Sequence, residues 1–77
     1  MFQDVNVMHF VKSLRNQERT LRYSIAPIEG GWEVREERDS QVVKRVRYKD
    51  WHRVERARKS IVTELDALRN KGWREEN

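Results

Sequence analysis

Residues 50–73 constrain the fold most strongly, because this one segment carries a helix start, a helical period and a helix stop. Asp50 can accept hydrogen bonds from the free backbone N–H groups of a first turn, and its charge suits the positive end of the helix dipole. Gly72 suits the left-handed position that ends many helices, with Trp73 packing back on Leu68. The segment therefore predicts one long helix over residues 50–72, roughly 33 Å in length.

Apolar residues within this segment recur at steps of three and four, which places them on one face of a helix. They are Trp51, Val54, Ala57, Ile61, Leu65 and Leu68. An apolar face of that length needs a sheet or a partner to cover it. With 77 residues, the chain is expected to form one small domain over residues 1–77 with a thin core.

Residues 20–48 supply the expected cover, because they alternate between apolar and polar side chains as half-buried strands do. We predict three strands over residues 20–26, 32–38 and 42–48, joined by turns at 27–30 and 39–41. The face expected to meet the helix consists of Leu21, Tyr23, Ile25, Trp32, Val34, Val42, Val46 and Tyr48.

The strand register can be predicted from cross-strand pairs. A three-residue loop at 39–41 sets Val34 opposite Val46, which pairs two apolar side chains. It also sets Glu33 opposite Arg47, which pairs two opposite charges. The same register gives the pairs Trp32 with Tyr48, Glu36 with Lys44 and Arg38 with Val42. In the first hairpin, a four-residue loop sets Ile25 against Trp32 and Tyr23 against Val34.

The N-terminal segment, residues 1–19, admits two interpretations. Val7, Phe10, Val11 and Leu14 follow helical spacing, which predicts a helix over residues 5–17, and a strand over residues 5–11 is the alternative. Residues 74–77 are expected to be a frayed tail. The predicted fold class is α+β: a three-stranded antiparallel meander packed against one long C-terminal helix, with an N-terminal helix.

Positive charge is concentrated in residues 44–59. These residues include eight Lys or Arg and only two acidic residues, Asp50 and Glu55, so their formal charge is +6. The rest of the chain carries −2, which gives the net charge of +4. Clustered cations can neutralise phosphates and release counterions, which favours binding of DNA or RNA. The candidate nucleic-acid-binding residues are Arg45, Arg47, Lys49, His52, Arg56 and Lys59. The alternative is a solvated face with internal ion pairs: Glu55 with Lys59, Glu33 with Arg47 and Glu36 with Lys44.

No pattern of catalysis or metal binding stands out. The chain has no cysteine, and His9 and His52 lack the spacing of a metal site. The sequence therefore predicts no enzyme, no metal and no cofactor. Trp32, Tyr48 and Trp51 are expected to pack in the core rather than stack on bases. Without an apolar run of about 18 residues or a secretory signal, we expect a cytoplasmic protein with no membrane contact.

Two functions follow as hypotheses. The first is a small, basic, non-enzymatic binding module that contacts nucleic acid through its Lys/Arg face. The alternative is a protein-interaction or homodimeric module whose charge serves solubility. Over roughly residues 20–70, the order of strands, a Glu29-Gly30-Gly31-Trp32 turn and a final helix resembles the layout of HicB-like antitoxin domains. That resemblance is one of fold and assigns no site residues.

Overall fold

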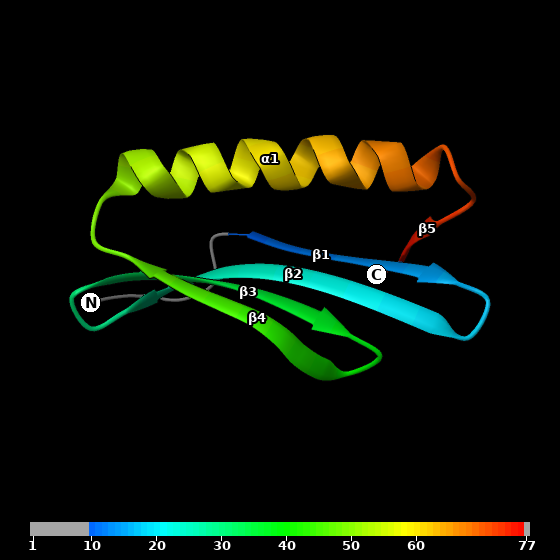
Figure 1. The fold of residues 1–77 in the computed structure, drawn as a ribbon, viewed down its shortest axis with the longest axis horizontal. Helices are drawn as coiled ribbons and strands as arrows, with labels where there is room; N and C mark the ends of the chain where they lie inside the picture. Colours follow the sequence, from blue (N-terminus) through cyan, green and yellow to red (C-terminus); the bar gives the residue numbers. More distant parts are fainter. Residues whose placement is uncertain (1–9, 77) are drawn as a thin grey trace, which may run out of the picture.

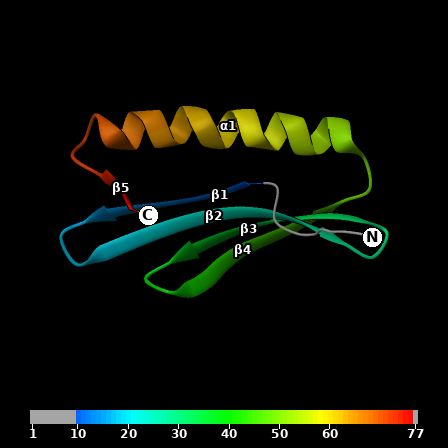
Figure 2. The same ribbon diagram turned by 180° about the vertical axis from the view of Figure 1, so that it is seen from behind.

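Five antiparallel strands form one sheet, and one helix runs across a single face of it (Figure 1). The computed structural model describes residues 10–76. Its elements are β1 (Phe10–Asn16), β2 (Arg19–Ile28), β3 (Gly31–Arg38), β4 (Gln41–Tyr48), α1 (Trp51–Arg69) and β5 (Arg74–Glu76). The strand order is β4-β3-β2-β1-β5. Seen from behind, the helix again lies on one side of the sheet (Figure 2).

The core lies between α1 and the strands β1 and β2. Leu14, Leu21 and Tyr23 from the sheet form one buried cluster with Ile61 and Leu65 from the helix. Burying a large apolar side chain stabilises a fold by about 1.5–3 kcal/mol, so these few residues supply much of the favourable free energy. The helix therefore packs on the strands as predicted. Most of the buried side chains of the sheet lie on the β1–β2 hairpin.

The predicted N-terminal helix is wrong for the part of it that the structure describes. Residues 10–16 form β1, which pairs with β2 so that Phe10 opposes Ile25 and Leu14 opposes Leu21. The meander therefore has four strands rather than three. Phe10 and Leu14 are four residues apart, a spacing that puts two side chains on the same face of a helix and of a strand alike. Residues 5–9, shared by the predicted helix and the alternative strand, lie outside the described residues.

The C-terminal tail also belongs to the sheet. Arg74–Glu76 form β5 beside β1, with Leu14 opposite Glu75. Glu75 accepts from Lys12 at 2.9 Å and from Arg69 at 2.7 Å, and Glu76 accepts from Arg15 at 2.6 Å. The predicted frayed tail is therefore wrong for residues 74–76. The two carboxylates bind cations of β1 and α1, and the tail was predicted as frayed because β1 was not predicted as a strand.

The β3–β4 hairpin follows the predicted register except near its turn. Val34 opposes Val46 and Glu33 opposes Arg47, as expected. The turn has only two residues, Asp39 and Ser40, with φ angles of 52° and 71°. An irregularity at Glu36/Glu37 then restores the register.

Val42 was predicted to face the helix, and this prediction is wrong. It pairs with Glu37 instead of Arg38 and leaves 43% of its surface exposed. The first hairpin differs too: Ile25 opposes Val34 and Tyr23 opposes Glu36, because the turn at 29–30 is two residues long rather than four. The slip is of two residues, so the same side chains of β2 still face the helix.

The capping interactions predicted at both ends of the helix are confirmed. The Asp50 carboxylate accepts from the backbone N–H of His52 at 3.0 Å. At the other end Gly72 has φ 103°, its N–H donates to the Arg69 carbonyl, and the Trp73 N–H donates to the Leu68 carbonyl at 3.1 Å. This is the Schellman arrangement. Regular helix stops at Arg69, three residues before the predicted limit. Within residues 10–76, no helix has both the length and the apolar character that crossing a membrane requires.

Candidate nucleic-acid interface

The six predicted contact residues are divided between two surfaces. Arg45 and Arg47 alternate with Val46 on β4, so they lie on the face of the sheet turned away from α1. His52, Arg56 and Lys59 lie exposed on α1, and Lys49 lies exposed in the connection between strand and helix. The sheet separates the first pair from the rest, so the six do not form one flat patch.

The face of the sheet away from the helix is organised around Glu33. Its side chain is 7% exposed and accepts from Arg35 at 2.8 Å and from Arg47 at 3.3 Å. Arg45 Nε lies 3.6 Å from the same carboxylate. The hydrogen bond from Arg35 lowers the pKa of Glu33, and the bond from Arg47 lowers it further, against the opposing effect of burial. The guanidinium groups of Arg35, Arg45 and Arg47 are therefore engaged with one shared carboxylate.

Cations on the helix and near it are differently placed. The expected pair of Glu55 with Lys59 is absent, because Glu55 instead accepts from Arg58 at 3.1 Å. The expected pair of Glu36 with Lys44 is absent as well, because Glu36 accepts from Arg38 at 2.7 Å. Among residues 10–76, five cations have no ion pair in this region, and we call them the basic edge: Lys44, Lys49, Arg53, Arg56 and Lys59.

Sequence reasoning missed Lys44 and Arg53 as site residues. Arg53 precedes Arg56 by three residues, a spacing that puts both on neighbouring turns of a helix. Both arginines line a shallow hollow together with Tyr48 and Ser60. Helical spacing could have found Arg53, whereas Lys44 required knowing that Arg38 takes the carboxylate of Glu36.

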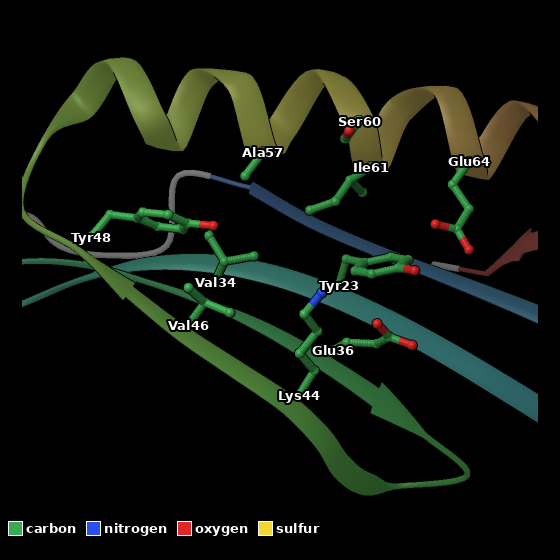
Figure 3. Close-up of a pocket in the computed structure, with 10 residues that line it drawn as sticks. All are labelled: Tyr23, Val34, Glu36, Lys44, Val46, Tyr48, Ala57, Ser60, Ile61 and Glu64. Atoms are coloured by element: carbon green, nitrogen blue, oxygen red, sulfur yellow. The ribbon is translucent and has the colours of Figure 1, made fainter.

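A groove separates α1 from strands β3 and β4, with a volume of about 320 Å³ (Figure 3). Its apolar lining comes from Val34 and Val46 on the strands and from Ile61 on α1. Lys44 reaches the groove from β4. The polar side chains that line it include Tyr48, Ser60 and Glu64. The groove shares Tyr48, Ala57 and Ser60 with the hollow that Arg53 and Arg56 line, so the two depressions are adjacent.

Tyr23 lies at the inner end of this groove and points toward Glu64 (Figure 3). Burial raises its pKa to about 12, and Glu36 and Glu64 raise it as well, Glu64 partly through a hydrogen bond. A phenol protonated this firmly serves as a hydrogen-bond donor to the carboxylate rather than as a base at neutral pH.

The aromatic residues are less buried than expected. Trp32 and Trp51 pack with ring centroids 4.7 Å apart and planes tilted by 58°, yet 39% of Trp51 is exposed. Tyr48 opposes Trp32 across the β3–β4 pair and is half-buried beside the groove. The prediction of core packing therefore holds for contact between the rings and fails for the burial of Trp51.

In the part of the chain that the structure describes, no three His, Cys, Asp or Glu side chains gather as metal ligands would. Comparison with protein families, with curated proteins and with solved structures found no match. None of these comparisons supports the resemblance to HicB-like domains, which depended on the predicted order of elements.

Proposed function

We propose that this protein is a small non-enzymatic module that binds nucleic acid through the phosphate backbone, with the basic edge as its contact surface. One observation carries the proposal: five cations on β4, on the β4–α1 connection and on the first half of α1 have no ion pair within residues 10–76. Glu33 engages Arg35, Arg45 and Arg47 on the far face of the sheet, whereas the cations of the basic edge have no carboxylate partner in residues 10–76.

Unpaired cations are better suited to phosphate binding than paired ones. A phosphate that meets Arg53 or Arg56 displaces only water and counterions, whereas one that meets Arg47 must compete with Glu33. If all five cations of the basic edge contact phosphates, the slope of log K against log salt should be about −3.5 for a single strand and about −4.5 for a duplex. The binding should be tolerant of sequence, since phosphate contacts carry no base information.

Salt-dependent binding of fluorescein-labelled single-stranded and double-stranded oligonucleotides, followed by anisotropy between 50 and 200 mM NaCl, tests the proposal. We expect the double variant Arg56→Glu/Lys59→Glu to bind at least about tenfold more weakly at 50 mM salt and to show a shallower salt slope, because two phosphate contacts are lost.

The matched control is Lys71→Glu/Arg74→Glu, which changes net charge by the same amount at the opposite end of α1. Both residues are exposed and have no ion pair within residues 10–76. An equal loss in both variants would mean that only net charge matters. No binding of any oligonucleotide at 50 mM salt would overturn the proposed function.

The alternative, a protein-interaction module, has one specific observation in its favour. β4 is an edge strand of eight residues, and Val42 and Val43 on it are 43% and 54% exposed. An edge strand presents free backbone groups to which another chain can add a strand. The cations on β4 favour an acidic strand over a second copy of this chain, because like charges opposite each other are destabilising.

A further inference from the structure

Building on the proposed function, we propose that the groove between α1 and β4 receives one unstacked base, so that the protein prefers single-stranded over double-stranded nucleic acid. Adjacency is the first argument. The groove lies beside the hollow lined by Arg53 and Arg56, because both are lined by Tyr48, Ala57 and Ser60. A strand whose phosphates lie on the two arginines therefore has a neighbouring depression within reach of its base.

Size is the second argument. Pockets that hold small ligands span about 300–1,000 Å³. At about 320 Å³ the groove is at the lower end of that range, which suits one nucleobase rather than a longer segment of chain. Figure 3 shows its lining side chains on α1 and on the strands that face α1. We expect a base to enter between α1 and β4 while its sugar and phosphate remain outside.

The chemistry of the lining is the third argument. Val34, Val46 and Ile61 offer an apolar surface to the flat ring, and Tyr48 adds an aromatic side chain on which a base can stack. Glu64 at the far end repels phosphate but can accept a hydrogen bond from an exocyclic amino group. Lys44 and Glu36 also line the groove, and their opposite charges offset each other there. The two arginines therefore favour phosphate in the hollow, with the neutral base inward.

Strand preference follows from the accessibility of the base. In a duplex each base is paired and stacked, and extracting it costs a few kcal/mol. A single strand presents its bases without that cost. Duplex binding would use only the phosphate contacts of the basic edge, so it should be weaker and insensitive to changes inside the groove.

The test uses a labelled 12-nucleotide strand with 2-aminopurine at its centre, either alone or annealed to its complement. This base carries an exocyclic amino group, and its fluorescence falls when it stacks on an aromatic ring. We expect at least about tenfold tighter binding of the single strand and a change in 2-aminopurine fluorescence when the protein binds, because the base exchanges its neighbours in the strand for the lining of the groove.

Two variants locate the base. Ser60→Phe fills the groove from an exposed position of α1, so the fold should be retained. Because Ser60 also lines the hollow of Arg53 and Arg56, we expect single-strand binding to weaken about tenfold and duplex binding to weaken clearly less. Thr63→Phe is the matched control, because Thr63 is exposed on α1 and lines neither depression. Circular dichroism confirms that both variants are folded.

The outcomes separate this inference from the function on which it rests. Equal affinity for single strand and duplex, no change in 2-aminopurine fluorescence and a silent Ser60→Phe would overturn the inference, while a loss with Arg56→Glu/Lys59→Glu would still support the function. Failure of both strands to bind at 50 mM salt would overturn both. Binding of polyglutamate that is as tight as that of the oligonucleotide and equally weakened by Ser60→Phe would assign the groove to an acidic peptide and also overturn the inference.

Discussion

At the scale of single residues, Glu33 forms ion pairs with three arginines, more than any other carboxylate among residues 10–76. Its nearly buried carboxylate holds Arg35 and Arg47 by hydrogen bonds and has Arg45 nearby, so one acid organises the outer face of β3 and β4. Removing its charge leaves the arginines facing one another and takes away the acceptor that orients them. Breaking a hydrogen-bonded, poorly solvated charge costs more than removing an exposed one.

We expect Glu33→Gln to lower the free energy of unfolding by about 1–3 kcal/mol at pH 7. Because the pKa of Glu33 is lowered in the folded state, its contribution is present above the unfolded pKa of about 4.3 and is lost as pH falls below it. Urea unfolding at pH 7 and at pH 3 measures both effects. Glu37→Gln, on the same face and without an ion pair in residues 10–76, is the control and should change little.

Tyr23 gives the opposite pH dependence. Its pKa of about 12 in the folded state lies above the ordinary value of 10.0, because burial, Glu36 and Glu64 disfavour the phenolate. Its contribution to stability is therefore fully present below pH 10 and is lost as pH rises toward 12. We expect absorbance titration at 295 nm to show one tyrosine ionising near pH 12, and Tyr23→Phe to remove that step. A Tyr23 that ionises near pH 10 would show that the site is solvated.

At the scale of secondary-structure elements, local signals and most of the β3–β4 register were predictable, whereas the pairing of β1 and β5 was not. The ends of α1 follow from Asp50 and Gly72, whose effects act within one turn. β1 was mistaken for helix because Phe10 and Leu14 fit both periods, and only the partner strand β2 decides between them. Two ion pairs expected under the alternative of a solvated, internally paired face are wrong for a similar reason: Arg58 and Arg38 bind the carboxylates assigned to Lys59 and Lys44, a competition that the sequence does not show.

Gly72, which follows α1, and Gly31, which begins β3, should respond differently to substitution by alanine. At Gly72 nothing lies within 4 Å of an added Cβ, so Gly72→Ala should cost only the strain of φ 103°, about 1 kcal/mol. At Gly31 an added Cβ would clash with the Tyr48 carbonyl, so β4 would have to move and the loss should be larger. Thermal or urea unfolding ranks the two variants, and an equal loss would contradict this account of the β3–β4 contact.

At the scale of the whole molecule, the sheet has two unlike edges. β5 covers β1 along only three residues but is fixed by ion pairs to Lys12, Arg15 and Arg69, whereas β4 leaves eight residues at the other edge. Open edges invite pairing with other chains unless charges or bulges disrupt them. β4 has both: the extra residue Val43 interrupts its pairing with β3, and Lys44, Arg45 and Arg47 lie along it.

We therefore expect β4 not to pair with a second copy, and multi-angle light scattering after size exclusion to give the mass of a monomer, 9.4 kDa, at 50 mM NaCl. Deleting Val43 and replacing Lys44 by Thr should straighten the edge and remove a repelling charge, which should produce dimers or larger species. The control Val43→Ser/Lys44→Thr keeps the extra residue and should remain largely monomeric. If the unmodified chain forms a dimer and the variant Arg45→Glu/Arg47→Glu forms the same dimer, self-association uses a surface other than β4. A deletion variant that stays monomeric would show that the irregularity at β4 is not what protects the edge.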